Sequence, residues 1–389
     1  MNKNNEWLDP LYLDSFLSEE EKEIRKNTKK FCDQFLAPKV VNDNKQHYFD
    51  KEIYKEFGKM GLLGVNVKGY GSSELNKVSY GLIAAEIESI DSSYRSSLSV
   101  QSSLVCFPIE SYGSEEQKKN YLEDLIKGNL VGCFGLTESE AGSDPSSMKT
   151  NYIEKKDHFL INGSKNWITN APIADLFLIW ALNEKKEINL FLIPKNTKGL
   201  HTSVIENKTS LKISPTGQII LDNVKIPKEN IFPKTKGWKS VFACLNNARY
   251  GIAWGVMGAA KNSWLIAKEY TENRIMFKKP LAANQLIQNK LAIMQTEISI
   301  GFSACLHAGR AFDQGEDIKI AVSMLKRNNC KKAINIVREA RDMLGANGLL
   351  EEYHLMRHLV NLETVKTYEG SEDIHSLILG KFQTNIGAF

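Results

Sequence analysis

The sequence predicts an α+β protein in which a β domain lies between two helical domains. Apolar residues recur at helical spacing before about residue 131 and after about residue 236. The segment between them instead has short apolar runs separated by Asn-Gly, Pro and Lys-Gly. A chain of 389 residues is also too long for one core of ordinary size. We therefore expect an N-terminal helical domain over 1–131, a middle β domain over 132–235 and a C-terminal helix bundle over 236–389.

The first domain begins with a helix signal. Ser18 and Glu21 have the spacing of a capping box, and a helical stripe of apolar residues follows them. A second stripe runs over 83–94, and several glycines over 61–71 mark a loop between the two helices.

The middle domain is predicted from four apolar or alternating runs, at 159–161, 176–180, 190–193 and 217–221. Asn162-Gly163 follows the first run directly and predicts a hairpin turn, because both central positions of that turn favour positive φ. In the last third, helical periodicity is interrupted chiefly at 278–280 and 345–348.

Composition excludes several classes of function. The net charge is +4, with 50 basic and 46 acidic residues interspersed, so nucleic acid is not an expected partner. The apolar runs fall short of the roughly 18 residues of a membrane span, so no membrane partner is expected. Six cysteines lie far apart, without a Cys-x-x-Cys pair or a Cys/His cluster, and predict reduced thiols and no metal site.

The first residues, 1–7, have no apolar signal core, and an acidic run at 19–23 is unlike a transit peptide. These features favour a cytoplasmic protein. If the source is a eukaryote and a presequence has been removed, the expected compartment is the mitochondrial matrix.

Several motifs identify a family resemblance. They are FGLTE at 134–138, AGSDP at 141–145, NGSKNWITN at 162–170, RIMF at 274–277 and YEG at 368–370. Together they resemble the acyl-CoA dehydrogenase family, from about residue 10 to the C-terminus. YRSSLSVQSS at 94–103, CLNNARYGIAWG at 244–255 and DIHSLILG at 373–380 resemble its glutaryl-CoA dehydrogenase branch. The resemblance implies a β-barrel-like middle domain, a C-terminal four-helix bundle, FAD, a homotetramer and electron-transfer flavoprotein as the electron acceptor.

The resemblance makes Glu369 the base that removes the α-proton of an acyl-CoA thioester. Because that proton is very weakly acidic, the enolate needs hydrogen bonds to the thioester oxygen as it forms. Without the surrounding motifs, Glu369 would be interpreted as an exposed loop carboxylate.

Arg95 is the predicted determinant of the substrate. If Glu88, Arg95 and Ser99 share a helix, they lie on one face, where Arg95 and Ser99 would bind a distal carboxylate and Glu88 would orient the guanidinium. The alternative is a solvated i,i+4 pair between Asp91 and Arg95.

A distal carboxylate suits glutaryl-CoA. Oxidation would give glutaconyl-CoA, which would lose carbon dioxide to form crotonyl-CoA, as in lysine and tryptophan degradation. The open alternatives are a non-decarboxylating or other short-chain dehydrogenase, an oxidase that uses oxygen directly, and a non-catalytic acyl-CoA-binding scaffold.

The resemblance also supplies the remaining site residues. For the substrate they are Ser96, Ser143, Asn246, Arg249, Tyr368 and Gly370. For the flavin ring they are Phe134, Leu136, Thr137, Gly142, Ser143, Trp167, Ile168, Thr169 and Ser371. For the FAD tail, usually bound by a neighbouring subunit, they are Arg274, Phe277, Gln285, Asp342, Leu344, Gly345 and Ala346.

Several of these residues have a simpler interpretation in isolation. Trp167 would be a core residue, 345–348 a helix C-cap, and Asn246 and Arg249 a surface amide and a salt-bridge partner.

Three further positions bear on the geometry and charge of the predicted site. The family usually has Gly where this chain has Lys278, which puts the tail geometry in question. Glu372 would raise the pKa of Glu369 if the two carboxylates were close. His375 is expected to be a structural hydrogen-bonding residue.

Overall fold

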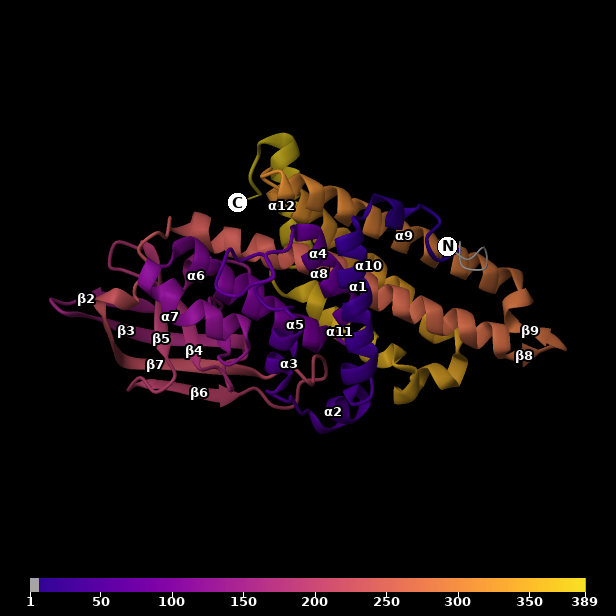
Figure 1. Cartoon of the computed structure of the whole chain (residues 1–389), viewed down its shortest axis with the longest axis horizontal. Coiled ribbons are helices and arrows are strands. Elements are labelled where there is room, and N and C mark those ends of the chain that lie inside the picture. The colour runs from indigo at the N-terminus through magenta and orange to yellow at the C-terminus, as the bar shows by residue number, and fades with distance from the viewer. Residues whose placement is uncertain (1–6, 389) are drawn as a thin grey trace.

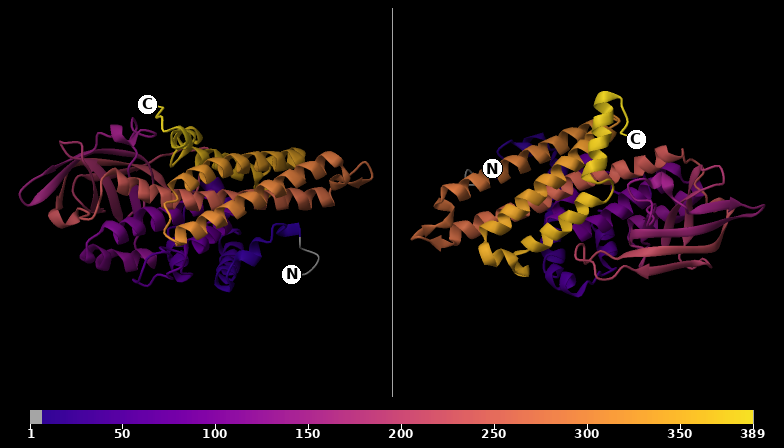
Figure 2. Two further views of the ribbon diagram at one scale, coloured as in Figure 1. Left: turned by 90° about the horizontal axis from the view of Figure 1, so that it is seen from above. Right: turned by 180° about the vertical axis from the view of Figure 1, so that it is seen from behind.

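The protein has a helical N-terminal part, a middle part built on one curled sheet, and a C-terminal part of long helices, as predicted (Figures 1 and 2). The structure is a computed structural model that describes residues 7–388. Residues 1–6, on which the interpretation of the N-terminus mainly rests, lie outside the described residues.

Among the described residues, the N-terminal part comprises seven α-helices, of which α4, α5 and α6 pack against α8 of the C-terminal part. They are α1 (Glu19–Phe31), α2 (Val40–Gln46), α3 (Ile53–Lys59), α4 (Lys77–Glu88), α5 (Ser92–Ser99), α6 (Phe107–Tyr112) and α7 (Glu115–Ile126). The predicted capping box is confirmed, because Ser18 Oγ accepts from the Glu21 N–H at 3.2 Å while Glu21 Oε2 accepts from the Ser18 N–H at 2.8 Å. A π-helical segment, Val100–Cys106, joins α5 to α6.

The middle part is a single seven-stranded sheet. Its strands are β1 (Gly132–Gly135), β2 (Asn151–Glu154), β3 (His158–Thr169), β4 (Leu176–Leu182), β5 (Ile188–Pro194), β6 (Leu200–Val204) and β7 (Thr216–Pro227). The sheet order is β1-β4-β2-β3-β7-β6, and β5 also pairs with β4. Strand β4 thus has three partners: β5 pairs with it from Leu176 to Leu182, while β1 pairs at Leu176–Ile179 and β2 at Leu182. This branching curls the sheet around its own core.

The hairpin predicted at Asn162-Gly163 is wrong. Both residues lie inside β3, where the register against β7 shifts between Ile161 and Gly163. Asn162 Oδ1 accepts from the Asn223 N–H of β7 at 2.8 Å, and a Cβ on Gly163 would lie 2.5 Å from Thr150 Oγ1. The dipeptide therefore forms a bulge that lets another chain segment approach closely, which is the other common use of a strand glycine.

The C-terminal part contains α8 (Trp238–Asn273), α9 (Gln285–Asp313), α10 (Lys319–Met343), α11 (Leu355–Thr367) and α12 (Glu372–Thr384). Helix α8 has 36 residues, hence a length of about 54 Å, and carries the chain away from the sheet to the opposite end of the molecule (Figure 1). A short hairpin of β8 (Ile275–Met276) and β9 (Lys279–Pro280) joins α8 to α9 there.

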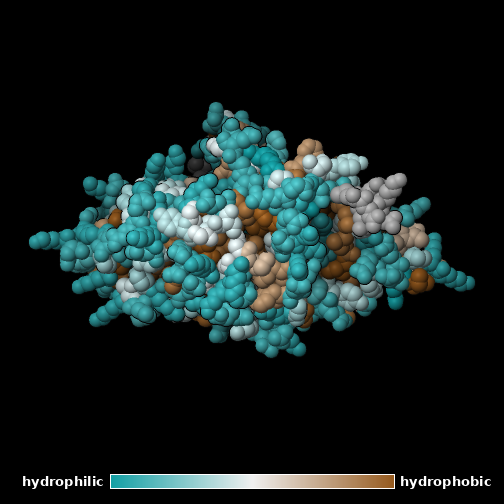
Figure 3. Space-filling view, in the orientation of Figure 1, coloured by the Kyte–Doolittle hydropathy of each residue, from teal (hydrophilic) through white to brown (hydrophobic). Residues whose placement is uncertain are grey.

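The face drawn in Figure 3 is mostly hydrophilic, with hydrophobic surface gathered near its middle. Over residues 7–388, none of the helices combines the length and apolar character needed to cross a membrane.

Candidate active site

Glu369 lies in the short turn between α11 and α12. Its φ is 54° and that of Gly370 is 95°, so two successive residues have left-handed backbone conformations. Arg249 of α8 donates from Nε to the Glu369 carbonyl at 2.8 Å. Lys326 of α10 donates to the carbonyls of Tyr368 and Gly370 at 2.8 and 2.7 Å. The turn is thus fixed from two helices at the residues around the predicted base.

The carboxyl group of Glu369 has an uncommitted oxygen. Oε2 is buried and has no hydrogen-bond partner among the described residues. Burial raises the pKa of Glu369, and the charges of Arg95, Arg249 and Lys326 oppose that increase. A carboxylate whose pKa is raised and whose oxygen lacks a partner has the properties of a general base.

Arg95 and Glu88 form a buried ion pair. Arg95 Nε donates to Glu88 Oε2 at 2.6 Å, and the side chains are 1% and 0% exposed. A second guanidinium nitrogen, Nη2, donates to the Tyr368 hydroxyl. The third nitrogen, Nη1, makes no hydrogen bond within residues 7–388. The guanidinium thereby connects Glu88 to the residue that precedes Glu369.

The assumption that Glu88, Arg95 and Ser99 share one helix is wrong, although the contact between Glu88 and Arg95 is present. Helix α4 ends at Glu88, and Asp91, with φ −162° and ψ 139°, caps a separate helix, α5. The Asp91 side chain accepts from the Ser93 N–H at 2.7 Å, which favours a new helix start over continuation. The two residues meet because of how α4 and α5 pack.

The alternative pair between Asp91 and Arg95 is also wrong. Asp91 Oδ2 accepts from Arg357 Nε at 2.8 Å and from Asn361 Nδ2 at 2.9 Å, both on α11. Arg95 is therefore neither solvated nor committed to its i−4 neighbour.

Hydroxyl groups line the segment around Ser99. The Tyr80 hydroxyl of α4 donates to Ser99 Oγ at 3.2 Å and accepts from Ser103 Oγ at 3.0 Å. Ser96 and Ser99 are both buried. Tyr80 is a residue that the sequence analysis missed, because a tyrosine on an apolar helix stripe is typical of a core position.

Asn246 and Arg249 lie on one turn of α8, where Arg249 Nη1 donates to Asn246 Oδ1 at 3.1 Å. Arg249 is buried, so its interpretation as a surface salt-bridge partner is wrong. A Cβ on Gly370 would lie 2.9 Å from His375 Nε2 and 3.3 Å from Arg249 Nη2, which explains the glycine next to Glu369.

Two expectations about α12 are not met. Glu372 pairs with Lys331 and Lys366, each at 3.1 Å. Partial burial would raise the pKa of Glu372, but the two lysines lower it overall. Glu372 is not among the charges that shift the pKa of Glu369. Neither ring nitrogen of buried His375 has a hydrogen-bond partner among residues 7–388, and burial lowers its pKa to about 3.

The predicted ring-binding residues gather at the end of β1 and the end of β3. The Asn166 N–H donates to the Thr137 carbonyl at 2.9 Å. Glu138 and Ala141 form an isolated antiparallel β-bridge, which brings Gly142 and Ser143 to the same edge of the sheet. Buried Lys165 donates to the Leu136 carbonyl at 3.0 Å and to Glu138 Oε1 at 2.9 Å. An internal ion pair therefore fixes this edge.

Trp167 is 59% exposed and has a φ of 60°. Its interpretation as a core residue is therefore wrong. An exposed indole at a strained strand position offers an uncovered aromatic surface, and a Cβ on Gly142 at the same edge would meet no heavy atom of the described residues within 4 Å. These observations fit a planar ring system bound at this edge.

Three other residues predicted to bind the flavin ring have side chains that are less accessible to a bound ring. Phe134, Leu136 and Ile168 have buried side chains. Phe134 and Leu136 share a hydrophobic cluster with Leu245 and Ala248 of α8, which lie beside Asn246 and Arg249. The edge is thus continuous with the predicted substrate segment. Ser371 Oγ accepts from the Ile374 N–H at 3.3 Å as the N-cap of α12.

The predicted tail residues lie at the opposite end of the molecule from the ring residues (Figure 1). Arg274 follows α8 directly, Phe277 is 87% exposed in the β8–β9 turn, and Gln285 begins α9. Asp342, Gly345 and Ala346 are exposed at the end of α10, whereas the side chain of Leu344 is buried. One copy of the chain does not bring both sets together.

The turn that contains Lys278 is a tight hairpin. Phe277 and Lys278 have φ values of 51° and 65°, so Lys278 adopts a conformation that favours glycine. Gly345 follows the C-cap of α10 with a φ of 58°, which confirms its interpretation as part of a helix end.

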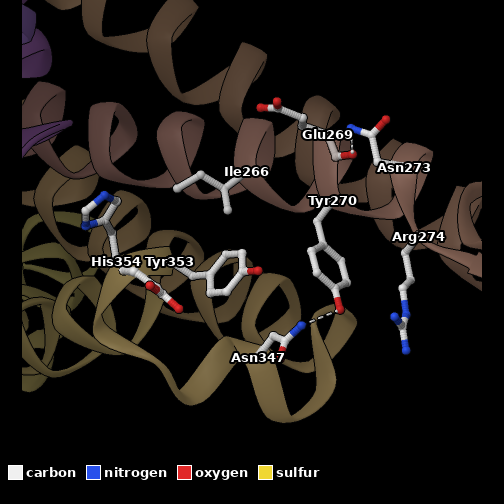
Figure 4. A pocket seen from close by; sticks show the side chains of 9 residues that line it. Ile266, Glu269, Tyr270, Asn273, Arg274, Asn347, Tyr353 and His354 are labelled. Atoms are coloured by element: carbon white, nitrogen blue, oxygen red, sulfur yellow. Dashed lines mark hydrogen bonds between the residues drawn. The ribbon is translucent and has the colours of Figure 1, made fainter.

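A cavity of about 530 Å³ lies beside Arg274, lined by Tyr270, Asn347 and Tyr353 among others (Figure 4). Asn347 Nδ2 donates to the Tyr270 hydroxyl at 3.0 Å across it. Arg274 itself forms no side-chain hydrogen bond or ion pair with any residue from 7 to 388.

No group of three or more His, Cys, Asp or Glu side chains that could hold a metal occurs within the described part of the chain. All six cysteines are free and buried.

Comparison with known proteins gives three adjoining family matches. The acyl-CoA dehydrogenase N-terminal, middle and C-terminal domain models match residues 18–129, 133–224 and 235–383. A glutaryl-CoA dehydrogenase of Desulfococcus multivorans is 32% identical over 385 residues, covering 96% of this chain and 99% of the relative.

Solved structures are similar over nearly the whole chain. A glutaryl-CoA dehydrogenase from Mycobacterium smegmatis, in complex with FADH2, has 41% identity and a TM-score of 0.97, covering 98% of this chain and 99% of that chain. A chain in a structure of the electron transferring flavoprotein of Acidaminococcus fermentans has 30% identity and a TM-score of 0.92, covering 95% and 99%.

Proposed function

This chain belongs to the acyl-CoA dehydrogenase family and is a FAD-dependent dehydrogenase, and from this premise we propose that it catalyses oxidative decarboxylation of glutaryl-CoA to crotonyl-CoA and carbon dioxide. One observation carries the choice of substrate. Buried Arg95 donates to the hydroxyl of Tyr368, the residue next to Glu369, so a carboxylate-binding side chain lies beside the base.

In this proposal, Glu369 removes the α-proton through its uncommitted Oε2. The raised pKa of Glu369 supports this role, because a stronger base takes up the proton of a weak carbon acid more readily. The N–H groups of the Glu369 turn are the chain's candidates for stabilising the thioester oxygen.

Bound FAD would accept the hydride from the β-carbon. Thr137, Gly142, Ser143, Trp167 and Thr169 would hold its ring at the edge of the sheet. The exposed indole of Trp167 and the open space at Gly142 support this assignment.

Arg95 would hold the distal carboxylate through Nη1, which has no partner among the described residues, while Glu88 keeps the guanidinium in place. Ser99, positioned by Tyr80, would add a hydroxyl. Loss of carbon dioxide leaves an electron pair that delocalises into the thioester, and the γ-carbon then takes up a proton. The similarity to two glutaryl-CoA dehydrogenases supports this sequence.

A second candidate is a dehydrogenase of an uncharged short acyl chain, without decarboxylation. Glu88 already balances the charge of Arg95 within the protein, so the pocket does not require a substrate carboxylate for neutrality.

Anaerobic mixing of the purified enzyme with glutaryl-CoA tests both candidates, with flavin absorbance and carbon dioxide release followed together. We expect bleaching of the flavin and stoichiometric carbon dioxide. Bleaching without carbon dioxide contradicts decarboxylation, and bleaching only by butyryl-CoA supports the second candidate. A preparation that contains no flavin contradicts the assignment of the site.

We also propose that the protein assembles as a homotetramer in which a neighbouring copy supplies Arg274, Phe277 and Gln285 to the FAD tail. Leu286, Ile293 and Ile300 recur every seven residues along the exposed face of α9 and form an apolar stripe that a second copy would cover. Light scattering should give the mass of four chains, and a monomer with full FAD content would contradict the shared site.

Electron-transfer flavoprotein is the proposed electron acceptor, supported by the family and by the similarity to a chain in a structure of that protein. Its reduction by glutaryl-CoA should require this enzyme. Hydrogen peroxide formed at the rate of substrate loss would indicate an oxidase instead.

A further inference from the structure

Lys326 is a buried lysine whose three ammonium protons all have acceptors. It lies on α10, is 1% exposed, and donates from Nζ to the carbonyls of Lys366, Tyr368 and Gly370 at 3.0, 2.8 and 2.7 Å. It forms no salt bridge with a carboxylate within residues 7–388. Its hydrogen bonds therefore go entirely to the segment that contains Glu369.

The three acceptors are spaced around the predicted base. Helix α11 ends at Thr367, and the carbonyl of Lys366 is one of those that a helix end leaves unpaired. Tyr368 and Gly370 lie beyond the helix and flank Glu369 on both sides. Satisfying the end of α11 would explain only the first bond, so the other two require a different reason.

That reason is the backbone conformation of Glu369. A left-handed conformation is unfavourable for a residue other than glycine, and it persists only where the surroundings impose it. With φ 54° at Glu369, the carbonyls on either side must point in defined directions. One ammonium group bonded to both carbonyls fixes those directions, and Arg249 holds the carbonyl between them.

We propose that Lys326 is a positioning residue for the dehydrogenation, holding the turn of Glu369 so that the carboxylate faces the substrate. This inference rests on the proposed role of Glu369 as the base.

The charge of Lys326 has a second effect. The charged and titratable groups that face the turn are Arg95 of α5, Glu88 of α4, Arg249 of α8, Lys326 and Cys330 of α10, the Tyr80 and Tyr368 hydroxyls, and His375 of α12. Burial lowers the pKa of Lys326, and the Glu369 carboxylate opposes that change. Reciprocally, the ammonium lowers the pKa of Glu369 against the effect of burial.

The test compares Lys326→Met with the wild-type holoenzyme in anaerobic flavin reduction by glutaryl-CoA. Lys331→Met is the matched control, since Lys331 lies on the same helix and pairs with Glu372 on the surface. We expect Lys326→Met to retain FAD but to reduce its flavin on the order of 100-fold more slowly, because misplacing a catalytic group by about 1 Å costs that much. We expect its acidic pH limb to move to higher pH. Lys331→Met should match the wild type in both.

An unchanged rate and pH limb in Lys326→Met would overturn the proposal, as would equal losses in both variants. If Lys326→Met does not fold, Lys326→Gln replaces it, because an amide supplies two donors without a charge. In Lys326→Gln the acidic pH limb should still move, while flavin reduction should slow by less than the roughly 100-fold expected without any donor. An unmoved limb with a wild-type rate would overturn the proposal. If butyryl-CoA but not glutaryl-CoA reduces the wild type, the proposed substrate is wrong, and butyryl-CoA serves as the probe for Lys326.

Discussion

Arg95 and Glu88 form a buried ion pair, with Arg95 Nε 2.6 Å from Glu88 Oε2, although the two residues belong to different helices. The pair lies against α8 at Gly255, where a Cβ would be 2.0 Å from Glu88 Oε2. Through Tyr368, the same guanidinium reaches the turn of the proposed base. Substrate choice, helix packing and the position of Glu369 are therefore coupled through one guanidinium.

Arg95→Gln should selectively reduce the turnover of glutaryl-CoA. Hydrogen bonds to a charged group contribute about 1.5–3 kcal/mol, so kcat/KM for glutaryl-CoA should fall roughly 10- to 150-fold. Butyryl-CoA, which has no distal carboxylate, should be affected only a few-fold. Steady-state assays with both substrates measure the ratio.

Arg95→Gln also leaves Glu88 buried without its partner, which alone destabilises a protein. The double variant Arg95→Gln, Glu88→Gln removes that penalty. It should still lose more kcat/KM for glutaryl-CoA than for butyryl-CoA. Equal losses for both substrates in the double variant would mean that Arg95 has only a structural role.

Glu369→Gln should abolish flavin bleaching by acyl-CoA while FAD stays bound. It should also stabilise the fold at neutral pH. Because the folded-state pKa of Glu369 is raised, the folded protein binds the carboxyl proton more tightly than the unfolded chain does. The stability of the wild type therefore falls as the pH rises from the unfolded-state pKa of Glu369 to its folded-state pKa. Each unit of pKa increase corresponds to about 1.4 kcal/mol.

Denaturant unfolding at several pH values measures this effect. The stability gap between Glu369→Gln and the wild type should close as pH falls below the ordinary glutamate pKa of about 4.3. A wild type that is more stable than Glu369→Gln at neutral pH, with the difference lost toward acidic pH, would show that the pKa of Glu369 is lowered in the folded protein.

Gly255→Ala should disrupt the ion pair from the α8 side. Glu88 would have to move away from the added methyl group, and overpacking of this kind costs roughly 1–3 kcal/mol. Gly380→Ala is the control, because a Cβ there meets nothing within 4 Å. Since alanine favours a helix by about 0.5–1 kcal/mol over glycine, Gly380→Ala should be neutral or stabilising in denaturant unfolding.

Ile293→Lys should break the proposed assembly and release FAD together. A charge in the middle of the apolar stripe on α9 would be desolvated at the interface, which is strongly unfavourable. Sedimentation and the flavin-to-protein absorbance ratio measure the two effects. Tyr48→Lys replaces an exposed aromatic residue on the N-terminal part, at the end of α2, and should change neither. Loss of assembly with full FAD content would contradict a shared site.

The sequence by itself determined the order of helical, β and helical parts, because periodicity is a local property of the chain. It also determined the capping box at Ser18, since both hydrogen bonds span only three residues. The family motifs indicated Glu369 and Arg95 for the same reason, as each lies in a contiguous and recognisable run. Local information failed at Asn162-Gly163, where the choice between a turn and a bulge depends on β7 and Thr150.

Only the tertiary structure decided which charges meet. Glu88 and Asp91 are close in sequence, yet one carboxylate pairs with Arg95 and the other with Arg357 of α11. Glu372 is three residues from Glu369, yet it pairs with Lys331 and Lys366 at the surface. Lys326, more than forty residues from the base in sequence, binds the carbonyls around it. Such contacts depend on helix packing and turn direction, which the spacing of residues along the chain does not specify.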